Sequence, residues 1–245
     1  MTTSVPTKER IERALACCMT LCAGYLDGYG LLVLGTYVSF MSGNTTMTGV
    51  KAGQGALSAA LIPAIAIVCF LAGSAGGNIV KHLRARQAPG IVLLLIAALA
   101  AAAALGGGPL EPKRVAIALL GFAMGMVNPV LPKIGGESIS LTFMTGTLSR
   151  IGGHLGLALV GAPVQGSEGS WDTHLRRARM GAELWASFLI GAVLSGAAIS
   201  ASRAYALWPA VAVILLLATA TFFAETPAEG GQPKAPEAPK GPLRA

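Results

Sequence analysis

Apolar residues occur in long runs along the chain, and short polar or charged segments separate these runs. A helix needs roughly 20 residues to cross about 30 Å of hydrocarbon, and these runs are close to that length, except that the third is short unless Pro89 and Gly107 are included. The runs lie at 14–34, 57–79, 91–106, 115–132, 183–203 and 205–223. The pattern therefore predicts an all-α fold, a polytopic transmembrane helix bundle with six spans.

Two further apolar stretches, 35–53 and 139–164, are interrupted by Gly, Thr and Asn, and the second also contains Arg150 and His154. Three interpretations fit such interruptions: full spans, half-helices and re-entrant segments. If one or both stretches cross the membrane, the bundle has seven or eight spans.

Composition and charge agree with a membrane location. The chain of 245 residues is 53% apolar and only 12% charged, far from the balance of a soluble domain. Its net charge of +7 comes from Lys and Arg in short clusters between the apolar runs and in the tails. Such clusters are typical of cytoplasmic loops. We expect contact with the lipid bilayer, no nucleic-acid partner, a place in the cytoplasmic (inner) membrane, and both termini in the cytoplasm.

A short polar phrase occurs twice in this chain, as FMSGNT at 40–45 and as FMTGT at 143–147. Aligned without a gap, the two copies also match two later glycines and place Lys51 opposite His154. Apolar helices resemble one another by chance, but matched glycines and polar residues do so less easily. The phrase therefore predicts a duplication into two homologous halves.

Flanking matches extend the repeat in both directions. Upstream, GYLD at 24–27 corresponds to GMVN at 125–128, and downstream, FLAG at 70–73 corresponds to FLIG at 188–191. Equivalent segments of duplicated halves meet near a pseudo-twofold axis, where many transporters hold their substrate at mid-membrane depth. Three spans in each half would make the repeats inverted, and four would make them parallel.

The repeat also divides the chain into segments. The predicted membrane repeats are 14–106 and 115–223, joined by an inter-repeat loop at 107–114. Residues 1–13 are predicted to form a cytoplasmic N-terminal segment. Residues 224–245, rich in Pro, Gly and charge, cannot bury enough apolar surface to fold and are predicted to form a disordered cytoplasmic tail.

Taken together, AGYLDGYG followed by FMSGNT, and later GFAMGMVN followed by FMTGT, resemble the YoaK-like family of multi-pass bacterial membrane proteins. The resemblance covers most of residues 14–223. The usual first phrase of that family is close to F-M-T-G-N, so Ser42 is a conservative departure that keeps the hydroxyl. The resemblance implies an integral membrane protein of unknown function, and it supplies no substrate and no catalytic residue.

Asp27 is the main candidate for a residue whose charge takes part in function. It lies inside the first predicted span, where an ionised carboxylate costs about 2.5 to 3.5 kcal/mol. It must be partnered, hydrated or protonated there, and an acid that exchanges a proton suits a proton-linked carrier. The alternative is structural, with Asp27 accepting hydrogen bonds from a neighbouring helix. Its equivalent, Asn128, cannot ionise but is suited to pair with it across the axis.

The two phrases supply the other candidate residues for binding a solute or ion. Their glycines permit a break in a helix, and their hydroxyl and amide groups can satisfy freed backbone or a ligand. These candidates are Ser42, Gly43, Asn44, Thr45, Thr145, Gly146 and Thr147. The competing interpretation is helix packing, because small residues four apart let membrane helices approach closely. The same small-residue faces suggest a homo-oligomer.

Arg150 and His154 are secondary candidates. They lie four residues apart and share one face if 139–164 is helical, where they would recognise an anion or respond to pH. The alternative is a cationic edge that faces a loop.

No catalytic signature is present. The chain lacks HExxH, GxSxG, a Walker-type phosphate loop and paired CxxC motifs, so we expect no enzyme, no catalytic residue, no cofactor and no metal. The leading hypothesis is a transporter or permease for a small solute, an ion or a proton, with its site between the two halves. A membrane scaffold or accessory subunit and a membrane-embedded enzyme remain as alternatives.

Overall fold

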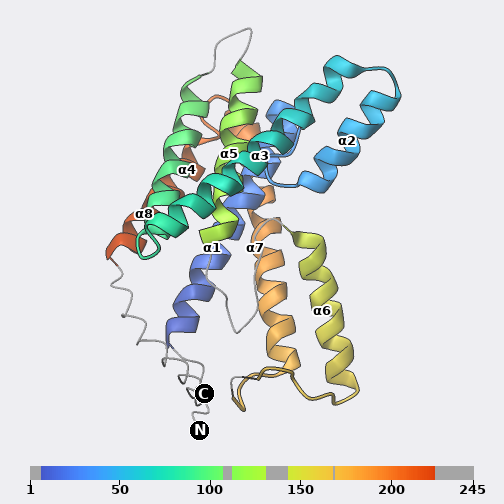
Figure 1. The fold of residues 1–245 in the computed structure, drawn as a ribbon, viewed down its shortest axis with the longest axis vertical. Coiled ribbons are helices and arrows are strands. Elements are labelled where there is room, and N and C mark those ends of the chain that lie inside the picture. The colour runs from blue at the N-terminus through green and yellow to red at the C-terminus, as the bar shows by residue number, and fades with distance from the viewer. Residues whose placement is uncertain (1–6, 107–111, 131–142, 168, 224–245) are drawn as a thin grey trace, which may run out of the picture.

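The computed structural model describes residues 7–106, 112–130, 143–167 and 169–223, and over these ranges the regular structure is entirely helical (Figure 1). The elements are α1 (Thr7–Tyr29), the π-helix η1 (Gly30–Leu34), α2 (Met41–Gly53), α3 (Leu57–Leu83), α4 (Ala88–Leu105), α5 (Pro112–Val130), α6 (Met144–Leu159), α7 (His174–Ala201) and α8 (Trp208–Phe223). The predicted all-α bundle is confirmed. The predicted tail at 224–245 and most of the inter-repeat loop lie outside the described residues.

Four of the helical segments are long and apolar enough to cross a membrane: Glu9–Leu34, Leu57–Leu83, Ala88–Leu105 and His174–Ala201. The apolar helix α8 is shorter. The short helices α2 and α6 contain 13 and 16 residues, which corresponds to about 20 and 24 Å at 1.5 Å per residue. Neither matches the roughly 30 Å of a hydrocarbon core by itself.

Helix α7 begins earlier than the apolar pattern suggested, at His174 instead of 183. The polar segment SEGSWDTHLRRAR, at 167–179, lies before the predicted span 183–203, and its second half forms the first turns of this helix. The cause is local, because the side chain of Thr173 accepts a hydrogen bond from the backbone N–H of Arg176 at 3.2 Å and so caps the helix start.

Two extensive helix pairs form the centre of the molecule, and each joins the predicted halves. Helix α1 packs along α7, and α3 packs along α5. The first helix of each half therefore lies against the third helix of the other half, and this reciprocal exchange is what a duplicated fold with a pseudo-twofold axis would show. Helices α4 and α8, the fourth of each half, pack against each other.

Glycines allow the close approach of these pairs. A Cβ atom added at Gly24 would lie 2.0 Å from the carbonyl oxygen of Phe188 in α7, and one added at Gly191 would lie 2.0 Å from that of Leu21 in α1. The α3–α5 crossing repeats this arrangement at equivalent positions. There, a Cβ at Gly125 would lie 2.1 Å from Phe70 O, and one at Gly73 would lie 2.0 Å from Phe122 O. Only glycine fits such backbone-to-backbone contacts.

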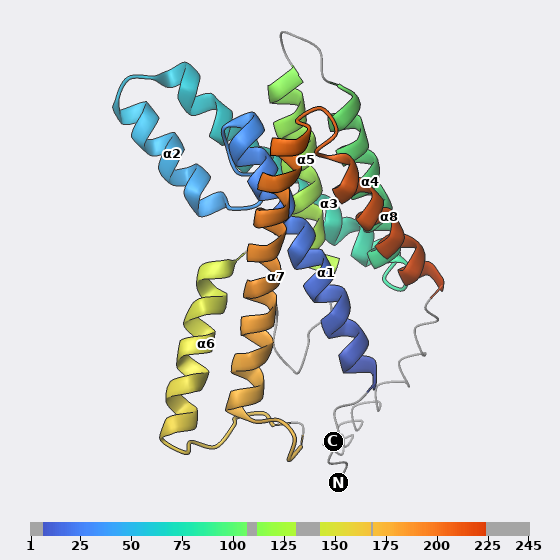
Figure 2. The same cartoon turned by 180° about the vertical axis from the view of Figure 1, so that it is seen from behind.

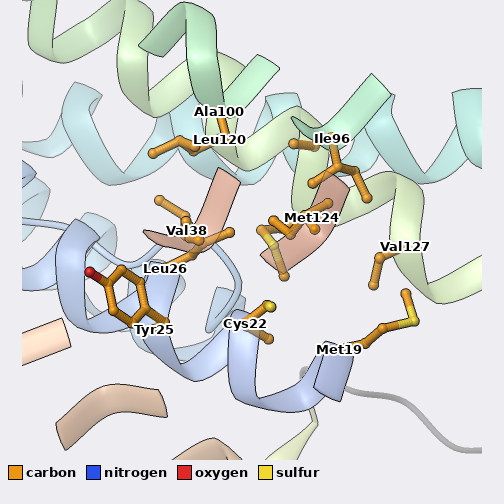
Figure 3. Packing of buried hydrophobic residues seen from close by; sticks show 14 of the residues in the cluster. Met19, Cys22, Tyr25, Leu26, Val38, Ile96, Ala100, Leu120, Met124 and Val127 are labelled. Carbon is orange, nitrogen blue, oxygen red and sulfur yellow. The ribbon is translucent and has the colours of Figure 1, made fainter. Parts of the chain in front are cut away.

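The apolar core lies where α1, α4, α5 and α8 converge. Leu26, Ile96, Leu120 and Met124 are among its buried side chains, and they point toward one another from three helices (Figure 3). A cation lies at the end of α5, one of the central helices. Lys81 Nζ donates to the carbonyl oxygen of Pro129 at 2.7 Å, which satisfies a free carbonyl at the end of α5.

Candidate functional site: a buried acid and the linker before α2

The chain leaves the helical path between η1 and α2, at residues 35–40. Gly35 adopts the left-handed conformation, with φ at 77°, and its N–H bonds to the carbonyl oxygen of Gly30. This residue ends the π-helix and turns the chain, a conformation that favours glycine. The backbone groups that follow are no longer satisfied by a helix, and inside a membrane they require other partners.

Asp27 of α1 supplies partners for this linker. Its Oδ1 accepts hydrogen bonds from the backbone N–H groups of Val38 and Ser39, at 2.8 and 2.7 Å, and its Oδ2 accepts one from Ser39 Oγ at 2.6 Å. The side chain is buried, with 4% of its residue surface exposed. All three donors belong to the linker of the same half, so the carboxylate is both solvated and oriented by this short segment.

Asn44 of α2 binds the same linker from the other side. Its Oδ1 accepts from Thr36 Oγ1 at 2.9 Å and from the backbone N–H of Tyr37 at 3.1 Å, and its Nδ2 donates to the carbonyl oxygen of Tyr37 at 2.7 Å. Asn44 is fully buried. Two polar side chains, one before and one after the linker, therefore fix its path.

The geometry also explains why the polar phrase occurs twice. Phe40 and Phe143 each precede the first residue of a short helix, and each ring lies over the glycine three residues later. A Cβ added at Gly43 would lie 2.4 Å from the Phe40 ring, and one at Gly146 would lie 2.1 Å from the Phe143 ring. The phrase thus builds the first turn of a half-length helix in both halves.

The remaining residues of the phrases are distributed unevenly. Thr147, the equivalent of Asn44, is buried, and its Oγ1 donates to the carbonyl oxygen of Phe143 at 3.3 Å. Ser42, Thr45 and Thr145 are exposed on their helices. Their outward positions separate them from the Asp27 linker.

Asn128 is half-buried close to the end of α5. The segment that would correspond to the linker in the second half, 131–142, lies outside the described residues. The described part of the site is therefore Asp27, Asn44 and the linker residues Thr36 and Ser39, the last two of which the sequence interpretation missed. Their signal was weak: both are single hydroxyl residues in a stretch of ordinary composition.

Helices α2 and α6 lie on the same side of the molecule in both views, with their N-terminal ends turned toward each other (Figures 1 and 2). Each packs against the third helix of its own half, α2 on α3 and α6 on α7. The N-terminal end of a helix carries a partial positive charge. The N-terminal end of α2, which directly follows the Asp27 linker, therefore brings such a charge beside the linker.

The secondary candidates share one face of α6, as their spacing predicted. Arg150 and His154 line a small groove against α7, together with Thr147 and Arg177. His154 Nδ1 lies 3.0 Å from Nδ1 of His174, at the start of α7. Among the described residues, no group of three or more His, Cys, Asp or Glu side chains is arranged to hold a metal ion.

Comparison with known proteins assigns the chain to a family. The model of the family described as "Protein of unknown function (DUF1275)" matches residues 15–220. This chain belongs to the DUF1275 family. A UPF0700 transmembrane protein from Rhizobium meliloti (strain 1021) is 34% identical over 216 residues, which cover 87% of this chain and 88% of that relative. No solved structure matches.

The family assignment confirms the resemblance drawn from the two phrases, to multi-pass membrane proteins of unknown function. The DUF1275 chain is a transmembrane protein with several apolar helices. Its predicted place in the inner membrane, its cytoplasmic termini and its homo-oligomer stay predictions.

Proposed function

We propose that this DUF1275 protein is a permease for a small solute or an ion, and that its two halves move relative to each other around the Asp27 linker. The observation that carries the proposal is the buried carboxylate of Asp27, which holds an unwound segment directly before a half-length helix. Ionisable residues inside a membrane segment most often serve a transport path, and discontinuous helices are where transporters build their sites.

The hydrogen bonds of Asp27 give this proposal a mechanism. Oδ1 of Asp27 accepts from the N–H groups of both Val38 and Ser39, and hydrogen bonds to an ionised acceptor are roughly twice as strong as neutral ones, so the linker is held most firmly while Asp27 is ionised. Protonation would remove the negative charge, turn one of the oxygens into a donor, and weaken the hydrogen bonds to the linker. The linker between α1 and α2 would then be free to change shape, which would couple a proton on Asp27 to the position of α2.

The centre of the bundle supports a closed conformation. A cavity of about 20 Å³ lies between α1, α4, α5 and α8, and its lining, which includes Leu26, Ile96 and Val127, is apolar. Such a volume holds about one water molecule. A solute would therefore pass only after the halves part, as in alternating access.

A membrane scaffold or accessory subunit is the second candidate, and one observation favours it. Gly152, Gly153 and Gly156 lie along α6 with no atom of the described chain within 4 Å of their added Cβ positions. An open face of small residues is typical of helix association in membranes. The scaffold hypothesis predicts a stoichiometric partner that copurifies with the protein.

The test is an unbiased comparison of metabolite and ion flux in cells with and without the protein, followed by reconstitution in liposomes of any solute that responds. A permease moves that solute in liposomes containing only the purified chain. A purified, folded chain that moves none of the responding solutes, while a partner protein copurifies at constant ratio, would establish the scaffold instead.

A further inference from the structure

The groove between α6 and α7 has a lining unlike the rest of the bundle. Arg150 and His154 reach it from α6, and Arg177 reaches it from α7, next to the buried hydroxyl of Thr147. The described residues that line it include no carboxylate. Asp172 binds Arg177 from one side, through contacts of 3.0 and 2.7 Å, and so fixes the direction of its guanidinium group.

The helix dipole adds to this positive potential. The first turn of α7 contains His174, Arg176 and Arg177, of which Arg176 is paired with Glu9 and Asp172, and Arg177 with Asp172. The free N–H groups at this helix start carry a partial positive charge, and that charge favours an anion in the groove beside them.

The internal repeat provides a comparison within the same chain. The α2–α3 hairpin packs like the α6–α7 hairpin, but the positions equivalent to Arg150, His154 and Arg177 are Met47, Lys51 and Ala59. The hairpin architecture therefore does not require the two arginines. The contacts with Asp172 account for Arg177, so it is Arg150, replaced by Met47 in the first half, that suggests a ligand for this half.

We propose that the α6–α7 groove binds a phosphate group, and that the phosphate belongs to an anionic phospholipid. Basic pockets between membrane helices are suited to phospholipid headgroups. The groove has a volume of about 10 Å³, room for about one water-sized group, which fits one phosphate oxygen that enters from the surface. This proposal is independent of the permease hypothesis.

The surface beside the groove suits the rest of such a lipid. Helix α6 packs chiefly against α7, which leaves its outer side uncovered by the described chain. Leu148, Leu155 and Leu157 are 48%, 45% and 43% exposed on this helix. An acyl chain would lie along Leu157, which follows Arg150 by seven residues and so lies on the same side of α6, while the phosphate contacts Arg150 and Arg177.

The experiment is native mass spectrometry of the purified full chain after incorporation into vesicles of phosphatidylglycerol and phosphatidylcholine in equal amounts. We expect the wild-type chain to retain phosphatidylglycerol in preference. The variant Arg150→Gln should bind it roughly fivefold more weakly, and Arg150→Gln with His154→Gln more weakly still. Lys51→Gln, which removes a cation at the equivalent position of α2, should retain the wild-type preference.

Two further arms complete the test. Arg150→Lys keeps the charge and should retain phosphatidylglycerol, which shows that charge and not a folding defect decides the result. Inorganic phosphate added to the detergent-solubilised chain serves as the second probe. If inorganic phosphate binds in a way that depends on Arg150 and the lipid does not, the groove is still a phosphate site, but its ligand is free phosphate and not a phospholipid. Equal retention of both lipids, with no phosphate binding that Arg150 affects, would overturn the proposal.

Discussion

The glycine crossings allow a quantitative test of the reciprocal packing. Replacing Gly24 by Ala would place a methyl group 2.0 Å from the carbonyl oxygen of Phe188, whereas real Cβ contacts essentially never fall below 3.0 Å. Helices α1 and α7 would have to separate by about 1 Å, the difference between these distances. Gly125→Ala would meet Phe70 O at 2.1 Å and force the same separation of α5 from α3.

The energy follows from this separation. A gap of 0.5 to 1 Å removes about a quarter to a half of the dispersion attraction at the contact, and overpacking of a well-packed protein core typically costs about 1 to 3 kcal/mol. Alanine regains up to about 1 kcal/mol of helix propensity. We expect Gly24→Ala and Gly125→Ala each to lower the free energy of unfolding by about 1 to 2 kcal/mol, and by similar amounts.

The assay is unfolding in mixed micelles by titration with a denaturing detergent, followed by circular dichroism. Gly152→Ala is the matched control, because beyond its own stretch of helix no atom of the described residues lies within 4 Å of its added Cβ, and the change should be neutral or slightly stabilising. If Gly24→Ala and Gly125→Ala were as harmless as the control, or if only one of them were destabilising, the reciprocal crossing described above would be wrong.

Three further predictions concern the buried polar contacts. Asn44→Ala leaves the N–H and carbonyl groups of Tyr37 without their partner, so it should lower the free energy of unfolding by about 1 to 3 kcal/mol in the same detergent titration. The control Thr45→Ala, at an exposed position, should change that free energy by under about 0.5 kcal/mol. Tyr25→Phe removes a bond from Tyr25 to the carbonyl oxygen of Ala206 and should cost about 1 kcal/mol there, and no loss would mean that this bond is absent in the membrane. Asp27→Asn removes the charge of the acceptor, so it should speed amide hydrogen exchange in the linker 35–40 without speeding it in α4. Unchanged exchange in the linker would contradict the role of the carboxylate in holding the linker N–H groups.

The fold was largely predictable because its strongest signals are local. Apolar runs of membrane-spanning length indicated the helices. Small residues four apart indicated that helices could approach closely, and they do so at Gly24 and Gly125 but not, within the described chain, at Gly152 and Gly156. The start of α7 was not predictable from hydropathy, because its first turns are polar and depend on the Thr173 cap. Helix boundaries that rest on one side chain leave little trace in an apolar pattern.

The candidate site was predictable only in part. A buried acid in a membrane helix requires donors, and so Asp27 stood out. Its donors are two backbone N–H groups and the hydroxyl of Ser39, and backbone groups have no sequence signature. Asn44 was recognised as a polar residue of the repeated phrase, but its role in fixing Tyr37 depends on the irregular path of the linker.

The most direct test of the permease proposal is solute flux in liposomes that contain purified wild-type protein, Asp27→Asn, or the control Glu183→Gln. The control removes a carboxylate that pairs with Arg13 and Arg179 instead of the linker. We predict that Asp27→Asn, folded and incorporated at the wild-type level, loses flux of the responding solute, whereas Glu183→Gln keeps it. Full flux through folded Asp27→Asn would contradict a coupling role for the buried acid.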